Sequence, residues 1–225
     1  MKREHYCFWT VASGERASSA VAMIASARRA GVFKDFHVWT DAAIPDAECH
    51  APGRFDPRDG LFRFTYLRDA VSALKYDHYV WLDPQTEFTR DPGSVLRVLR
   101  RAPVHVPLTF DLADAARTDE EWCGVRCGEL ARRMREVGVA QRFVFAAHAG
   151  FFIVHREAVE TFCNLAFDFW HRCERDGLHL PCEPLLAYAA QMLSGDPRLH
   201  HFSHGADVWM PRTGIQRAAA PALLC

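Results

Sequence analysis

Residues 76–92 read YDHYVWLDPQTEFTRDP, and this stretch decides how the rest of the chain is interpreted. An apolar run from Tyr79 to Leu82 leads directly into the polar sequence Asp83-Pro84-Gln85. A short apolar run of this kind predicts a strand that is buried on both faces, as in a sheet covered by helices. A carboxylate that follows such a strand lies at the edge of the sheet where open α/β proteins bind their ligands.

Residues 83–87 have two interpretations at this point. If the chain stays extended, Asp83, Gln85 and Glu87 point the same way, because side chains alternate along a strand. Two carboxylates and an amide on one side suit a hard divalent cation, Mg²⁺ or Mn²⁺, that bridges a diphosphate. Alternatively, Asp83-Pro84 simply begins a turn, as this dipeptide often does.

Strand-like and helix-like segments alternate along the chain on both sides of this stretch. Apolar runs predict strands at 6–12, 36–40, 62–66, 78–82, 104–108, 149–154 and 200–209. Helical spacing of apolar residues predicts helices at 18–30, 68–76, 92–99, the second half of 111–137, 159–173 and 183–193. We therefore predict an α/β fold with a mostly parallel sheet, helices on both faces and a single domain over residues 1–225.

Composition and charge exclude several classes of protein. The chain has 225 residues, of which 49% are hydrophobic and 24% charged, as in soluble globular domains and unlike disordered, collagen-like or coiled-coil chains. Lys and Arg number 27 against 28 Asp and Glu, which disfavours electrostatic binding of nucleic acid. No apolar stretch approaches the ~20 residues of a membrane-spanning helix. The first residues lack a signal-peptide pattern, and we expect a cytoplasmic protein.

The cysteines do not form a recognisable metal or disulfide framework. The chain has 8 cysteines, too few for a disulfide scaffold of this length. Cys123 and Cys127 form a C-x-x-x-C pair, but no second pair follows at the spacing of a zinc ribbon or finger. We expect buried, reduced thiols and assign no role to this pair.

Several well-known nucleotide and catalytic motifs are missing. No G-x-G-x-x-G follows the first predicted strand, and no G-x-x-x-x-G-K-[ST] occurs in the chain, which disfavours dinucleotide dehydrogenases and P-loop NTPases. No G-x-S-x-G occurs, which disfavours a serine hydrolase of the α/β class. If the sheet is open, its ligand site is formed by residues just after the apolar runs. These are Thr10–Ser13, Asp41, Asp83–Glu87, Ala149–Gly150 and His201–Gly205, which include Val11, Ala12 and Gln85.

Residues 76–92 resemble the nucleotide-binding core of GT-A-fold glycosyltransferases, in which a strand ends in a D-x-D motif. Further stretches resemble the same enzymes in the same order: TVASGE at 10–15, HAGFFIVHRE at 148–157 and LPCEPLLAYAAQ at 180–191. HHFSHGADVW at 200–209 is similar to the closing motif of glycosyltransferase family 8, whose histidine is a metal ligand. Arg68 stands where that family has a helix arginine that contacts the donor.

The resemblance implies transfer of a sugar from a nucleoside-diphosphate donor, with UDP-sugar favoured, to an acceptor hydroxyl and with retention of configuration. The acceptor is a saccharide, a lipid-linked sugar or a small molecule, and peripheral association with a membrane is compatible with this activity. The donor-binding residues are Thr10, Val11, Ala12, Asp41, Arg68, Asp83, Gln85, Gly150 and Gly205. The ligands of Mn²⁺ or Mg²⁺ are Asp83, Gln85, Glu87 and His201. His148 and Glu183 contact the sugar or acceptor, and Glu183 is the candidate base if the enzyme inverts.

The chain also departs from the family pattern. Gln85 replaces the second aspartate of D-x-D, His148 replaces an asparagine, and the closing motif has an extra residue before Gly205 and no lysine. These changes keep open an alternative, a nucleotide-sugar-binding protein with impaired catalysis. A nucleotidyltransferase is disfavoured because SGERASS at 13–19 has no lysine. Simpler interpretations also stay open: Arg68 as a surface residue, His148 as a loop residue, and Glu183 as a charge favoured by the helix dipole.

Overall fold

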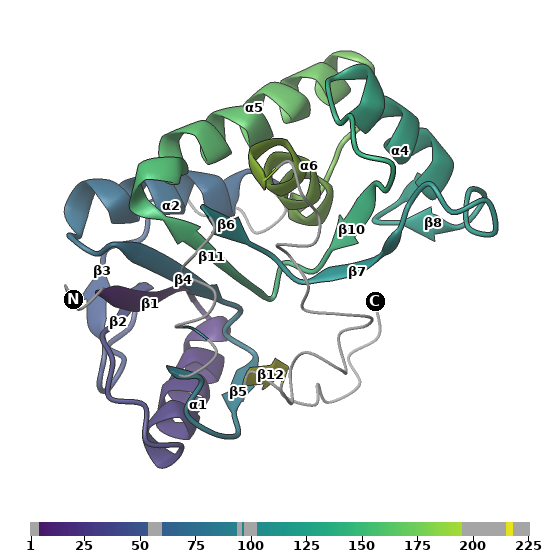
Figure 1. Cartoon of the computed structure of the whole chain (residues 1–225). Helices are drawn as coiled ribbons and strands as arrows, with labels where there is room; N and C mark the ends of the chain where they lie inside the picture. The colour runs from purple at the N-terminus through teal and green to yellow at the C-terminus, as the bar shows by residue number, and fades with distance from the viewer. Residues whose placement is uncertain (1–4, 54–59, 94–95, 97–102, 195–214, 218–225) are drawn as a thin grey trace.

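The computed structural model describes residues 5–53, 60–93, 96, 103–194 and 215–217, and a six-stranded sheet forms their centre (Figure 1). The strand order is β3-β2-β1-β4-β11-β6. The strands are β1 (Tyr6–Val11), β2 (Phe36–Trp39), β3 (Glu48–His50), β4 (His78–Leu82), β6 (Val104–His105) and β11 (Phe151–His155). Strand β1 is parallel to β2 and β4, and β2 is parallel to β3. Strand β11 runs antiparallel between β4 and β6, so the sheet is mostly parallel, as predicted.

Helices cover both faces of this sheet, which explains why its central strands are apolar throughout. Helix α1 (Arg16–Arg29) packs on one face, where Phe8 and Val80 belong to its hydrophobic core. Trp9 and Trp81, one residue further along each strand, belong to the core on the opposite face. That face is covered by α2 (Phe62–Ala73), α5 (Val159–Arg175) and α6 (Cys182–Ser194), with the short 3-10 helix η1 (Arg156–Ala158) leading into α5.

The remaining elements are short strand pairs and one helix at the side of the sheet. They are β5 (Thr86–Phe88) with β12 (Ile215–Arg217), β7 (Leu108–Asp111) with β10 (Phe145–Ala147), β8 (Glu121–Trp122) with β9 (Val125–Arg126), and α4 (Cys127–Glu136). Cys123 and Gly124 connect β8 to β9 with φ of 56° and 77°, the left-handed pair that a tight hairpin turn requires. Cys123 therefore lies in this turn and Cys127 at the start of α4, and both are free thiols, as are the other cysteines of the described chain.

The segment 62–66 differs from its predicted structure. Residues 62–66 form the first turn of α2, so the predicted strand is wrong. The alternation of Phe62, Phe64 and Tyr66 suggested a strand, but Leu67 and Ala70 are also buried, because this helix is enclosed on more than one side. The helix predicted in the second half of 111–137 is confirmed as α4, which spans Cys127–Glu136. The strand expected at 200–209 lies outside the described residues.

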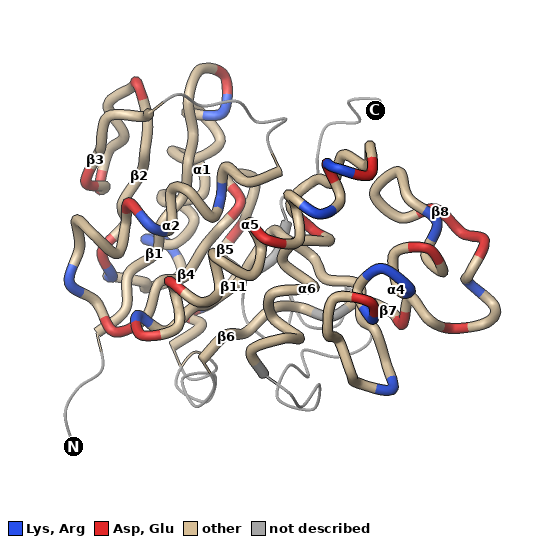
Figure 2. The backbone as a smooth tube through the Cα atoms, turned by 90° about the horizontal axis from the view of Figure 1, so that it is seen from above, with Lys and Arg blue, Asp and Glu red and all other residues tan. Residues whose placement is uncertain are grey.

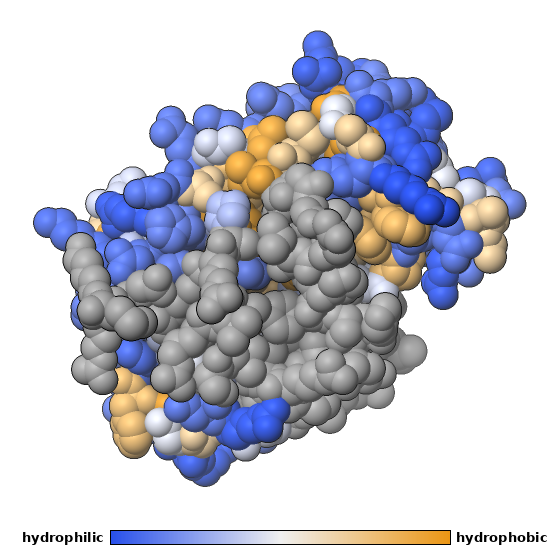
Figure 3. Space-filling view, in the orientation of Figure 1, coloured by the Kyte–Doolittle hydropathy of each residue, from blue (hydrophilic) through white to orange (hydrophobic). Residues whose placement is uncertain are grey.

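The described surface is mixed in charge and mostly hydrophilic. Figure 2 shows acidic and basic residues interspersed along the backbone, including α4 and the loop at β8. Figure 3 shows that hydrophilic residues dominate the described part of the face drawn there, with apolar colour limited to patches. None of the helices in the described part is long and apolar enough to cross a membrane.

Candidate functional site

The candidate site lies where the order of strands reverses, between β1 and β4. Strands β2 and β3 follow β1 on one side, whereas β4 and β11 lie on the other. The carboxyl ends of parallel strands form a ligand crevice at such a point. Strand β11 begins at the same edge: Phe151 pairs with Leu82, and the Asp83 N–H donates to the Gly150 carbonyl at 2.8 Å. The fold therefore brings residues 148–150 beside the end of β4.

Two polar side chains without a partner among the described residues lie in the last part of β1 and just after it. Thr10 is 1% exposed, and its Oγ1 finds no hydrogen-bond partner among the described residues, nor does Oγ of Ser13. The Gly14 N–H donates to Asp41 Oδ1 at 3.1 Å, which ties the end of β2 to the loop after β1. The Ala12 N–H donates to the Trp39 carbonyl at 3.0 Å. The predicted donor-binding residues of the first two strands thus share one edge.

The chain turns directly after Asp83, so the extended interpretation of residues 83–87 is wrong. Asp83 Oδ1 accepts the Gln85 N–H at 3.0 Å, and the Asp83 carbonyl accepts the Thr86 N–H at 2.9 Å. Gln85 is exposed, and Glu87 lies on β5, paired with β12. In the described part of the chain, no three His, Cys, Asp or Glu side chains converge at Asp83.

The cation beside Asp83 is Arg63, from the first turn of α2. Its Nη2 lies 3.9 Å from Asp83 Oδ2, and its side chain is only 11% exposed. The guanidinium lies 5.1 Å from the centre of the Trp81 ring, and its Nε has no hydrogen-bond partner among the described residues. Arg68, the predicted donor contact, is exposed and lies 5.5 Å from the Phe167 ring of α5. Arg68 follows Arg63 by five residues and therefore lies on a different side of α2, so the structure does not bring it to Asp83.

The start of α6 adds Cys182 and Glu183 to Asp83 and Arg63, and these four residues form the charged cluster. A Cβ on Gly60 would lie 2.3 Å from the Leu180 carbonyl, so only glycine allows this approach of the chain before α2 to the chain before α6. Burial lowers the pKa of Arg63, but its interactions with Cys182, Glu183 and Asp83 outweigh burial and leave the pKa raised. Burial raises the pKa of Cys182 to about 11, so its thiol is neutral at pH 7. Asp83 and Glu183 therefore share one guanidinium.

His148 and Gly150 also lie at this edge, in the loop between β10 and β11. The Gly150 N–H donates to His148 Nδ1 at 3.0 Å, so the neutral ring carries its proton on Nε2. A Cβ on Gly150 would lie 2.6 Å from Cε1 of His148, so any larger residue at this position would displace the ring. Of the predicted site residues, His201 and Gly205 lie outside the described residues.

Arg63 and Cys182 are the site residues that the sequence interpretation missed. Arg63 stands between Phe62 and Phe64, and a single charge inside an aromatic run is a signal that the residue is buried with a partner. The alternation of aromatic residues at 62–66 hides this signal, because it favours a strand. Cys182 directly precedes Glu183 and carries no signal of its own.

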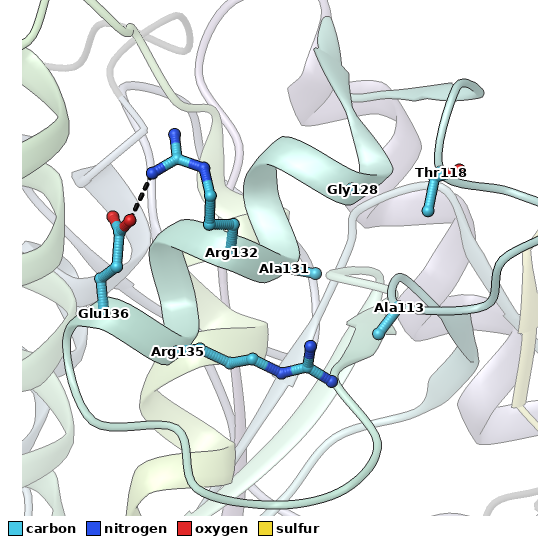
Figure 4. A pocket seen from close by; sticks show the side chains of 7 residues that line it. All are labelled: Ala113, Thr118, Gly128, Ala131, Arg132, Arg135 and Glu136. Carbon is cyan, nitrogen blue, oxygen red and sulfur yellow. Dashed lines mark hydrogen bonds and ion pairs between the residues drawn. The ribbon is translucent and has the colours of Figure 1, made fainter.

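A separate pocket of about 260 Å³ lies beside α4 and shares no residue with the charged cluster (Figure 4). Arg132 forms an ion pair with Glu136 there, and Arg135 donates to the Arg142 carbonyl at 3.2 Å. The lining residues are Ala113, Thr118, Gly128, Ala131, Arg132, Arg135 and Glu136. None of them follows a strand of the central sheet, and we do not assign the donor to this pocket.

Comparison with known proteins identifies the fold. Neither a family model nor a curated protein sequence matches the chain. Among solved structures, the chain is similar to the galactosyltransferase LgtC in complex with donor and acceptor sugar analogues, with a TM-score of 0.57 over 96% of this chain and 87% of that one. The chain has a GT-A fold. The sequence identity is 11%, so the similarity establishes the architecture, and the roles of the site residues stay predictions.

Proposed function

We propose that the protein transfers a sugar from a nucleoside-diphosphate donor, with UDP-sugar favoured, to an acceptor hydroxyl. The GT-A fold supports this proposal, and one observation carries it: the Arg63 guanidinium lies buried beside Asp83 and interacts with Glu183 at the strand-order reversal. Departure of the diphosphate develops negative charge, and a fixed, poorly hydrated cation stabilises such charge. The unpartnered Nε of Arg63 and Oγ1 of Thr10 are polar groups that a ligand can satisfy.

The residues divide into two roles in this proposal. Asp83 contacts the donor, whereas Arg63 holds the Asp83 and Glu183 carboxylates in position and stabilises the negative charge that develops on the diphosphate. His148, with a proton on Nε2, can donate to an oxygen of the sugar or acceptor. The resemblance of residues 200–209 to the family 8 closing motif favours retention, in which Glu183 orients the reacting sugar; in an inverting enzyme it would be the base. The acceptor class stays open between saccharides, lipid-linked sugars and small molecules.

The predicted Mn²⁺ or Mg²⁺ does not fit the described residues well. Asp83 Oδ1 accepts a backbone N–H in the turn, Oδ2 faces Arg63, and no further carboxylate or histidine of the described chain converges there. In this proposal, the chain's own side chains stabilise the charge that develops on the donor. The requirement for Mn²⁺ or Mg²⁺ stays a prediction, and the titration below tests it.

The experiment compares Asp83→Asn with Asp83→Ala. Asparagine keeps the oxygen that accepts the Gln85 N–H but removes the charge, whereas alanine removes both. We expect both variants to lose donor binding, by about 100-fold or more, because a charge-assisted contact is lost. Calorimetric titration with UDP, GDP and their sugar conjugates, each with Mn²⁺ and with EDTA, measures this.

Each result of that titration has a defined meaning. Binding to wild type that is lost in both variants supports the donor site, and a difference between Mn²⁺ and EDTA decides the metal requirement. Loss in Asp83→Ala alone assigns Asp83 to the turn rather than to the donor. No binding of any nucleotide to the wild-type protein would exclude the proposed function.

A second candidate is a nucleotide-sugar-binding protein without catalysis. It is favoured by Gln85, which replaces a metal-binding aspartate and lies exposed in a turn. The two candidates differ in chemistry: a transferase slowly hydrolyses its donor in the absence of acceptor, whereas a binding protein leaves it intact. Chromatography of the donor after incubation with protein separates them.

A further inference from the structure

The edge of the sheet formed by β2 and β3 carries a cluster that the function above does not use. His37, Glu48 and His50 direct ligand atoms toward one another, the only such group of three among the residues that the structure describes. His37 Nδ1 lies 3.0 Å from His50 Nε2 and 3.5 Å from a Glu48 carboxylate oxygen. The other Glu48 oxygen lies 3.8 Å from His50 Nε2.

The register of the two strands produces this convergence. His37 pairs with Glu48 and Trp39 pairs with His50, so residues 37 and 39 of one strand face the same side as 48 and 50 of the other. The Trp39 ring stacks on the His50 ring, with centres 4.6 Å apart, and fixes its orientation. His37 is 3% exposed and His50 20%, whereas Glu48 is 65% exposed and can adjust.

A second layer of groups sets the tautomer of His37. The Tyr76 hydroxyl donates its one proton to Asp35 Oδ2 at 2.7 Å. It must therefore accept from His37 Nε2, which lies 3.1 Å away, so that Nε2 carries the ring proton. The lone pair of the neutral ring is then on Nδ1, the atom that faces His50 and Glu48. Metal-ligating histidines are held in this way, by a hydrogen bond from the other ring nitrogen.

The contacts among the three side chains have lengths that suit a tetrahedral metal site. Zinc bonds of about 2.0–2.1 Å at tetrahedral angles hold ligand atoms about 3.3 Å apart. The two histidine nitrogens lie 3.0 Å apart, one Glu48 oxygen lies 3.5 Å from His37 Nδ1, and the other lies 3.8 Å from His50 Nε2, so each contact is close to that value. We propose that His37, Glu48 and His50 bind one divalent transition-metal ion, with Zn²⁺ favoured, and leave its fourth position to water or a small ligand.

The ligand types of this cluster favour a different metal from the Mn²⁺ or Mg²⁺ predicted for donor binding. Imidazole nitrogens suit Zn²⁺ and its neighbours, whereas Mg²⁺ and Mn²⁺ prefer oxygen ligands. Without metal, His50 Nε2 donates to His37 Nδ1; binding moves the His50 proton to Nδ1, and both rings stay neutral. The competing explanation is that this hydrogen bond and the Glu48 contacts are the whole function of the cluster.

The test is calorimetric titration of the full, reduced chain with Zn²⁺ alone. We expect one wild-type site, and affinities about 100-fold weaker in His50→Ala and Glu48→Gln. Tyr76→Phe keeps the ring but removes the hydrogen bond to His37, and we expect a loss of about 10-fold. Cys49→Ser is the matched control, because Cys49 lies between the two β3 ligands and instead accepts the Ile44 N–H at 3.4 Å.

Cobalt supplies a readout that does not depend on affinity. Co²⁺ bound by nitrogen and oxygen absorbs in the visible without the thiolate charge-transfer bands of a cysteine site, and His179→Ala, which removes a histidine paired with Glu174 alone, leaves the spectrum unchanged. Circular dichroism verifies that each variant is folded. The proposal is overturned if wild type binds no Zn²⁺, if His50→Ala binds as tightly as Cys49→Ser, or if the bound Co²⁺ shows thiolate bands.

Discussion

The end of β4 and the edge formed by β2 and β3 both place a carboxylate beside the sheet, but they neutralise it differently. Asp83 faces the guanidinium of Arg63, which also interacts with Glu183. Glu48 has no Lys or Arg partner in the described part of the chain and instead faces two imidazoles. A carboxylate that already has an arginine has little need of a metal, whereas neutral nitrogens beside a carboxylate leave room for a cation. The charge of the groups beside a carboxylate, more than the sequence motif that contains it, therefore indicates whether that carboxylate is available to a metal ion.

Removing Arg63 from the end of β4 has the largest expected effect on stability. Arg63→Ala leaves Asp83 and Glu183 without their shared guanidinium, and breaking a buried pair in this way costs about 3 kcal/mol of unfolding free energy. Arg68→Ala, on the exposed side of the same helix, changes it by less than about 0.5 kcal/mol. Urea denaturation of the two variants measures both. Equal losses would mean that Arg63 contributes only as a helix residue.

Binding of Zn²⁺ at the edge formed by β2 and β3 has the next largest expected effect on stability. Free Zn²⁺ at about 100 times its dissociation constant stabilises the folded chain by about 2.7 kcal/mol, if it binds the folded state alone. Thermal unfolding with Zn²⁺ and with EDTA should therefore differ in wild type and in Arg63→Ala, but not in His50→Ala. A Zn²⁺ shift that persists in His50→Ala would place the ion elsewhere.

A smaller effect on stability is expected at Gly150, whose missing side chain leaves space for the His148 ring beside the end of β4. Gly150→Ala puts a Cβ about where the ring now lies, and overpacking of this kind costs about 2 kcal/mol. Gly53→Ala is the control, because its Cβ would lie 3.7 Å from the Tyr66 hydroxyl, an ordinary contact. We expect a lower melting temperature for Gly150→Ala alone. Equal melting temperatures for the two variants would show that the His148 ring moves aside without cost.

The central strands could be predicted from the sequence because a strand that is buried on both faces consists of an uninterrupted run of apolar residues. The predicted strand at 78–82 coincides with β4, and those at 6–12 and 36–40 differ from β1 and β2 by a single residue at one end. Strand β3 was not predicted, because an edge strand of three largely exposed residues has no such pattern. The choice between a strand and a turn after Asp83 depended on one side-chain hydrogen bond, which composition does not reveal.

The two charged sites differ in how much of them could be predicted. Asp83, His148, Gly150 and Glu183 follow strands or begin a helix, and strand order alone predicts that most of them meet at one edge. His37, Glu48 and His50 converge only because β2 and β3 pair in one register, and a shift of one residue would turn Glu48 and His50 to the other face. Spacing along the chain does not contain that register.

The contact of Gly60 with Leu180 has a consequence for the order in which the protein is made. Residues 5–53 and the strands around them can begin to pack as soon as they leave the ribosome, but Arg63 acquires Cys182 and Glu183 only after about 120 more residues have been synthesised. Until then, the guanidinium has Asp83 as its only acidic partner in the cluster. The charged cluster is therefore a late product of synthesis, and a chain that stops before Leu180 carries the sheet edge without its second carboxylate.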